Sequence, residues 1–230
     1  MRIGNKLLLV FLALGYARIG SAITVLYAAP PLAPLASPQD FFQTTATLVT
    51  PGTLTLQTLG FGGGTSLTGP VIPAGGFDPL VAVFAGTGSG ATFVEGTSDI
   101  LTNYYDSALM GCPPAGTVMI GGMPTCGDVL MALSLSAGTY TILLSDAAYI
   151  PNAVFSGSGT LGDGFFDLTP PGGGFQTCLQ DNSACISDTA NWALDVTISD
   201  SSPTPEPAAW GMACLGLGLV VVARLRSGSR

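Results

Sequence analysis

The sequence predicts an all-β protein: an antiparallel β-sandwich, jelly-roll-like, of about eight strands. Three observations indicate this class. Several segments alternate apolar and polar residues with a period of two, glycine and proline are abundant (32 and 17 of 230 residues), and no segment between the two ends sustains a helical period. Apolar residues make up 47% of the chain, so the composition favours a folded core over a disordered chain.

The strands are expected where the apolar pattern is clearest. Residues 53–59, 139–145 and 191–199 alternate and are predicted to be half-buried strands. Residues 80–85 and 128–135 are more continuously apolar, as expected for strands that are covered on both faces. Glycine-rich turn clusters separate these segments, which is typical of antiparallel β-proteins.

The charged residues are segregated along the chain. The six basic residues are Arg2, Lys6, Arg18, Arg224, Arg226 and Arg230, and there is no histidine. Residues 19–223 therefore contain no cationic side chain, whereas all 14 acidic residues lie between Asp40 and Glu206. Nucleic acids need lysine or arginine to replace their counterions, so nucleic-acid binding is excluded.

The N-terminal segment is typical of a secretory signal peptide. Residues 1–22 have a basic start, a short apolar run and small residues before a cleavage site, which implies signal peptidase and the general secretion machinery as partners. A cut at residues 28–29 and an uncleaved anchor are the alternatives. Residues 23–40 form a Pro/Ala-rich lead-in, and the β-sandwich domain is expected over residues 41–200.

The C-terminal segment has three parts in a fixed order. They are a linker (residues 201–207) that ends in Pro205, Glu206 and Pro207, an apolar run (208–223) of about the length of a short transmembrane helix, and a cytoplasmic tail (224–230) with Arg224, Arg226 and Arg230 as a stop-transfer signal. This order resembles the PEP-CTERM sorting signal of exported proteins of Gram-negative bacteria, which a membrane enzyme, exosortase, recognises. The resemblance implies an exosortase-like partner. It also implies an inner-membrane-anchored precursor that is delivered to the cell envelope, the cell surface or the extracellular matrix. An ordinary C-terminal anchor is the alternative.

Three body segments carry a second resemblance: residues 65–83 (TSLTGPVIPAGGFDPLVAV), 135–144 (LSAGTYTILL) and 191–198 (NWALDVTI). They resemble a family of uncharacterised exported bacterial proteins with a GGFDP turn and an AGTYT strand. The architecture of that family is similar to the pre-peptidase C-terminal domain. The resemblance implies a β-sandwich and no established chemistry. Relatives often carry adjacent aspartates after the first long strand, whereas this sequence has Glu95 and Asp99 at a looser spacing.

The cysteines indicate disulfides. Cys214 lies in the C-terminal apolar run, and the exported part contains Cys112, Cys126, Cys178 and Cys185. An oxidising compartment favours disulfides, and four cysteines allow three pairings. We expect the near-neighbour pairs Cys112–Cys126 and Cys178–Cys185.

The residue types leave little catalytic chemistry. Without histidine, and without lysine in the body, the Ser-His-Asp, Cys-His and Ser-Lys nucleophile systems are excluded. We therefore expect no enzymatic activity, since a glycan hydrolase would have to use Glu95 with an aspartate or two aspartates. Residues 86–91 fit a nucleotide-binding glycine pattern superficially, but no helix follows, so a hairpin turn is expected.

Calcium is the candidate cofactor, because carboxylates in glycine-rich loops can supply its oxygen ligands outside the cell. The first candidate site is Asp78 with Glu95 and Asp99, and the second is Asp163 with Asp167. The alternative for Asp78 is a structural role in the GGFDP turn. The other acidic residues are expected on a hydrated surface.

Two adjacent aromatic pairs, Tyr104-Tyr105 and Phe165-Phe166, are candidate platforms for sugar rings, with core packing as the alternative. The leading function is that of an exported structural or adhesive protein associated with exopolysaccharide or biofilm. A calcium-assisted carbohydrate-binding module is the alternative, and a glycan hydrolase is the second alternative.

Overall fold

The structure, a computed structural model, describes residues 22–27, 34–97, 117–169, 173–178 and 184–200. These residues form several antiparallel sheets with one short α-helix, which confirms the all-β prediction. None of the helices in these ranges is long and apolar enough to cross a membrane. Almost all of the expected signal peptide, the Pro-Glu-Pro linker, the apolar run 208–223 and the basic tail lie outside the described residues.

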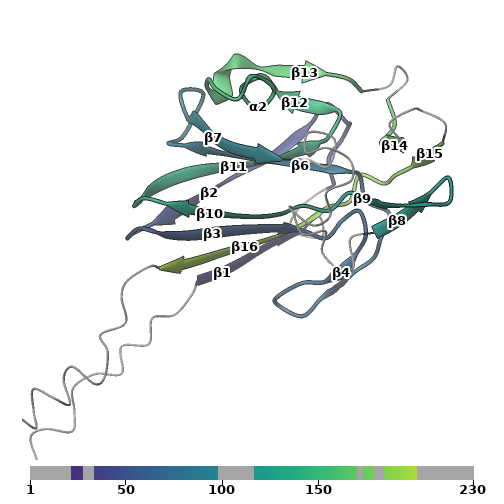
Figure 1. Cartoon of the computed structure of the whole chain (residues 1–230), viewed down its shortest axis with the longest axis horizontal. Coiled ribbons are helices and arrows are strands. Elements are labelled where there is room, and N and C mark those ends of the chain that lie inside the picture. The colour runs from purple at the N-terminus through teal and green to yellow at the C-terminus, as the bar shows by residue number, and fades with distance from the viewer. Residues whose placement is uncertain (1–21, 28–33, 98–116, 170–172, 179–183, 201–230) are drawn as a thin grey trace, which may run out of the picture. The chain divides into compact units, whose positions relative to one another are not determined.

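Two four-stranded sheets form the body of the domain (Figure 1). The first sheet has the order β1-β16-β3-β10, with β1 at Ala22–Tyr27, β16 at Ala193–Asp200, β3 at Gly52–Thr58 and β10 at Leu130–Leu135. The second has the order β2-β11-β6-β7, with β2 at Phe41–Leu48, β11 at Gly138–Asp146, β6 at Pro79–Ala85 and β7 at Thr92–Thr97.

The strand pairing is nested along the chain. The outermost strands β1 and β16 pair with each other, followed inward by β2 with β11, β3 with β10, and finally β6 with β7. The chain is therefore arranged as one long hairpin whose successive pairs alternate between the two sheets. Two further pairings, β16 with β3 and β11 with β6, complete the sheets.

Two features differ from the sequence expectation. The first sheet begins at β1, which lies in the segment expected as a lead-in, before the expected domain start at residue 41. Residues 128–135 were expected to be covered on both faces, but β10 is at the edge of its sheet and its exposure alternates. The sequence pattern cannot distinguish an edge strand from a central strand, because a run of apolar residues does not specify how many neighbouring strands a strand pairs with.

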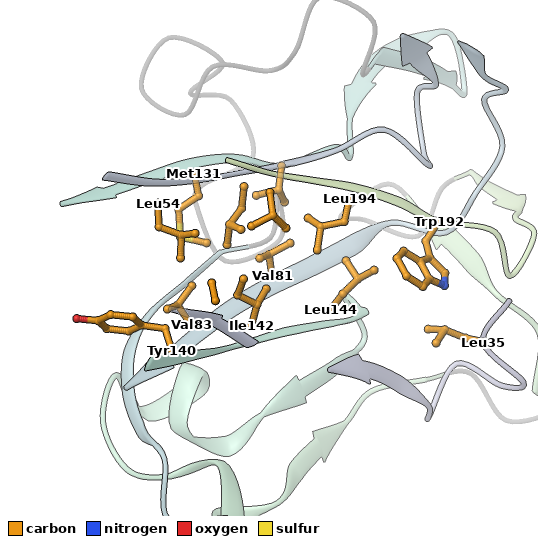
Figure 2. Packing of buried hydrophobic residues seen from close by; sticks show 14 of the residues in the cluster. Leu35, Leu54, Val81, Val83, Met131, Tyr140, Ile142, Leu144, Trp192 and Leu194 are labelled. Atoms are coloured by element: carbon orange, nitrogen blue, oxygen red, sulfur yellow. The ribbon is translucent and has the colours of Figure 1, made fainter. Parts of the chain in front are cut away.

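The main core lies between the two sheets (Figure 2). Leu54 and Leu194 from the first sheet meet Val83, Ile142 and Leu144 from the second, and all five side chains are fully buried. Burying a side chain of this size stabilises the fold by about 1.5–3 kcal/mol.

The half-buried pattern predicted for residues 53–59 is confirmed in β3, whose burial alternates. Residues 139–145 and 191–199 were predicted to be half-buried as well, but β11 is buried on both faces over most of its length, and Ala193 and Asp195 of β16 are buried beside the core residues. Further segments cover the outer faces of these two strands, which period-two alternation cannot reveal.

A cap covers the outer face of the second sheet (Figure 1). It consists of β12 (Tyr149–Pro151), α2 (Asn152–Ser156), the 3₁₀ helix η1 (Leu161–Asp163) and β13 (Phe165–Asp167). Ile150, Ala153 and Val154 of the cap pack on β6 and β11. Because β6 has the main core on one face and the cap on the other, residues 80–85 are buried on both faces, as predicted.

Three small hairpins extend from the body. They are β4–β5 (Gly64–Thr65 and Val71–Ile72), β8–β9 (Thr117–Ile120 and Met123–Cys126) and β14–β15 (Gln176–Cys178 and Cys185–Ser187). A disulfide joins Cys178 to Cys185 across the third hairpin, as predicted. The predicted Cys112–Cys126 pair cannot be placed, because Cys112 lies outside the described residues.

The GGFDP turn fits closely against its neighbours. Gly75 has a φ of +101°, which favours glycine, and the Gly76 amide donates to the Gly60 carbonyl at 2.8 Å. A Cβ atom on Gly76 would lie 2.4 Å from the Asn191 carbonyl oxygen and 2.7 Å from that of Gly60. The glycine pair is therefore required by the backbone geometry and by the space available.

Replacing Gly76 by alanine is expected to lower the free energy of unfolding by about 1–3 kcal/mol, because the backbone must shift to admit the methyl group. Gly90→Ala is the matched control, since a Cβ there meets nothing within 4 Å. Thermal or urea denaturation of both variants measures the difference. Equal stability of the two variants would contradict the close fit at Gly76.

Candidate functional site

Three exposed aromatic side chains lie on the cap or on the adjoining start of β2. The exposed fractions are 41% for Phe41, 61% for Phe155 and 41% for Phe166. Phe165 and Tyr149 are half-buried beside them. We call these five residues the aromatic surface.

The rings of the aromatic surface form two groups. Phe165 stacks between Tyr149 and Phe41, with ring centroids 4.4 and 4.9 Å apart and interplanar angles of 1° and 22°. Phe155 of α2 packs against Phe166 at 5.0 Å with a tilt of 34°. Because neighbouring residues of a strand point to opposite sides, the two groups lie on opposite sides of β13.

The aromatic surface is suited to binding. Soluble proteins seldom gather exposed apolar rings in one place unless the patch contacts a ligand or a partner. Ring faces can stack on the apolar face of a sugar, and stacked or edge-on aromatic contacts are worth about 0.5–1.5 kcal/mol beyond burial. The sequence pointed to Phe165-Phe166 but missed Phe41, Tyr149 and Phe155, which are scattered along the chain and assembled only by folding. The other pair, Tyr104-Tyr105, lies outside the described residues.

Two carboxylates flank the Phe165-Phe166 pair, and both are engaged in local turns. Asp163 accepts hydrogen bonds from the Thr160 amide at 2.8 Å and the Thr160 hydroxyl at 2.9 Å. Asp167 accepts bonds from the Thr169 amide and hydroxyl at 2.9 and 2.6 Å. These hydrogen bonds lower the pKa of both fully exposed carboxyl groups, so both are ionised at neutral pH.

The residues of the first predicted calcium site are not brought together. Asp78 is buried before β6, whereas Glu95 is exposed on β7 opposite Val83. Val83 follows Asp78 by five positions, which corresponds to roughly 16 Å along the sheet. Asp99 lies outside the described residues, and within them no three acidic or cysteine side chains form a group that could hold a metal ion.

Several acidic residues expected on a hydrated surface are buried instead. Asp128 accepts hydrogen bonds from the Thr58 hydroxyl at 2.9 Å and the Gly62 amide at 2.7 Å. Asp195, on the outer face of β16, accepts bonds from the Ser66 hydroxyl and the Leu67 amide, both at 2.9 Å. Burial raises the pKa of Asp128, although these hydrogen bonds partly oppose it. The only sign of these buried carboxyl groups in the sequence is the position of each aspartate, at the edge of an apolar strand or within one.

A third buried carboxyl group, Asp146, ends β11 beside the GGFDP turn. It accepts a hydrogen bond from the Ala148 amide at 2.8 Å, and the next residue, Ala147, donates to the Asp78 carbonyl. Burial, with a smaller contribution from the charge of Asp188, raises the pKa of Asp146 to about 7. Burial also raises the pKa of Asp188 to about 6, against a hydrogen bond from Thr177.

No family model, no curated protein and no solved structure matches this chain.

The stability of the protein is expected to decrease as the pH rises from about 4 to about 7. In this window folded Asp146 retains a proton that the unfolded chain, with the usual pKa of 3.8, has released. The free energy of unfolding falls by at most about 1.4 kcal/mol per pH unit for one such group. Denaturation curves between pH 4.5 and pH 8 measure the slope.

Asp146→Asn is expected to reduce this slope, because the amide oxygen can still accept from Ala148 but carries no titrating proton. The raised pKa of Asp188 maintains a smaller slope up to about pH 6. Asp163→Asn is the control, since that exposed carboxyl group is ionised in both states throughout the window. A wild-type stability that rises steadily toward pH 8 would refute the assignment of a raised pKa to Asp146.

Proposed function

We propose that this protein is an exported β-sandwich of the jelly-roll type that adheres to exopolysaccharide in the cell envelope or extracellular matrix. The nested pairing of the eight long strands supports the jelly-roll assignment, since this class winds one long hairpin into two facing sheets. The observation that carries the adhesive function is the aromatic surface, where three exposed rings lie on the cap and the adjoining start of β2.

Export is supported by two independent features. The described part of the chain contains a disulfide, Cys178–Cys185, which is typical of proteins in an oxidising compartment. The sequence has a signal-like N-terminus and a C-terminus that resembles the PEP-CTERM signal, so we propose processing by signal peptidase and by an exosortase-like enzyme. A precursor anchored in the inner membrane would then be delivered to the envelope, the surface or the matrix.

Adhesion through the aromatic surface requires no metal. A calcium-assisted module would need carboxylates that converge, whereas Asp78 and Glu95 lie far apart along β6. We therefore favour metal-independent stacking over the calcium-assisted alternative, and non-enzymatic binding over hydrolysis.

Mass spectrometry of the mature protein from fractionated cells tests export. The expected product begins after Ala22, because that cut retains nearly all of β1 and its pairing with β16, whereas a cut at residues 28–29 removes the strand. The Cys178–Cys185 disulfide is expected to be intact. A reduced protein in the cytosol with residues 1–22 still attached would refute export.

Co-sedimentation with insoluble cellulose and chitin tests adhesion. The double variant Phe155→Ala/Phe166→Ala is expected to bind about tenfold more weakly or worse, because two exposed stacking rings are lost. Leu67→Ala/Val71→Ala is the matched control, since it removes two apolar side chains that are also exposed, from the β4–β5 hairpin. Binding is expected to survive a chelator. Equal binding by both double variants would refute adhesion through the aromatic surface.

A further inference from the structure

The aromatic surface contains fixed negative charge as well as rings. Asp163 and Asp167 lie at the two ends of the segment Asp-Gly-Phe-Phe-Asp, and both side chains are exposed. Each is oriented by two hydrogen bonds from a single threonine, Thr160 or Thr169. These carboxylates therefore present charge at defined positions beside the rings, because each side chain is held in one geometry.

Asp167 belongs to the same side of β13 as the three stacked rings. It pairs directly with Tyr149 in the β12–β13 register and follows Phe165 by two residues, about 7 Å along the strand. Residues opposite each other in an antiparallel pair point to the same face, as do residues two apart. A ligand that stacks on the outer ring faces of this group is thus within reach of a carboxylate.

The charge of the body restricts which polymers can approach. Residues 19–223 contain no lysine or arginine to offset their acidic groups, so an anionic polysaccharide would meet repulsion and find no cationic partner. A positively charged group is favoured twice at this site. It is attracted by the carboxylates, and an ammonium ion over an aromatic ring gains a further cation–π interaction.

We propose that the aromatic surface binds a polysaccharide that contains amino sugars with free, protonated amines. Sugar rings of the polymer stack on the two groups of rings, Phe41 with Tyr149 on one side of β13 and Phe155 with Phe166 on the other. The ammonium groups pair with Asp163 and Asp167. This inference rests on the proposed adhesive function and specifies its substrate class. A protein partner fits less well, because an apolar protein face would have to desolvate both carboxylates without compensating them.

The test measures binding of the full-length chain to soluble glucosamine oligomers by calorimetry, with N-acetylglucosamine oligomers of equal length as the uncharged comparison. The deacetylated oligomer is expected to bind at least tenfold more tightly at low salt, and the difference is expected to shrink as salt is raised. Asp163→Asn/Asp167→Asn is expected to remove the preference but to retain binding of the acetylated oligomer. At position 167 one asparagine oxygen can accept both threonine hydrogen bonds, and at position 163 it can accept from the Thr160 amide while its NH2 group donates to the Thr160 hydroxyl. A thermal melt checks that each variant is folded.

Polylysine carries ammonium groups but no sugar rings. Phe155→Ala/Phe166→Ala is expected to weaken binding of both oligomers tenfold or more and to weaken polylysine binding much less, because polylysine has no sugar ring to stack. If both oligomers bind equally, or the acetylated one binds better, the amino-sugar inference is overturned and the adhesive function stands. If neither oligomer binds, and the protein also does not bind cellulose or chitin, both the amino-sugar inference and the proposed adhesive function are refuted. If the phenylalanine variant binds glucosamine oligomers like the wild type, the attraction is unspecific and the inference is overturned.

Discussion

The absence of any cationic side chain from residues 19–223 is the constraint on which much of this structure depends. A buried carboxylate in this chain cannot form a salt bridge within the domain, so it must accept hydrogen bonds or keep a proton. Asp128 and Asp195 both accept hydrogen bonds, and each thereby attaches a loop to a strand. Asp128 holds residues 61–62, and Asp195 holds the tip of the β4–β5 hairpin. Asp146 keeps a proton below neutral pH, since burial raises its pKa to about 7.

The same constraint applies to the surface. On a protein with both signs of charge, exposed carboxylates are commonly offset by neighbouring lysines, and an aromatic patch between them has no particular polarity. Here Asp163 and Asp167 are ordered by threonines, and no cation of the body balances them. The aromatic surface is therefore both apolar and negative, a combination that fits a polymer with apolar ring faces and positive substituents.

The position of the aromatic surface follows from the layer order. The second sheet carries apolar side chains on both faces, because β6 and β11 are central strands between the main core and the cap. The cap supplies Ile150, Ala153 and Val154 to cover the outer face, and its remaining side chains are left on the outside. Phe155 and Phe166 are among the exposed residues of the cap, so the element that buries the sheet also carries exposed rings.

The amino-acid pattern was enough to predict the fold class, most of the long strands and the Cys178–Cys185 pair. Alternation with period two is a local property, and two cysteines seven residues apart meet readily across a hairpin. The pattern also identified Phe165 and Phe166, because they are adjacent. Long-range packing places residues 128–135 at the edge of a sheet and buries Asp128, Asp146 and Asp195. It also brings Phe41, Tyr149 and Phe155 into the aromatic surface. These outcomes depend on which segments pack together over long separations in the chain, and no local pattern of residues records that choice.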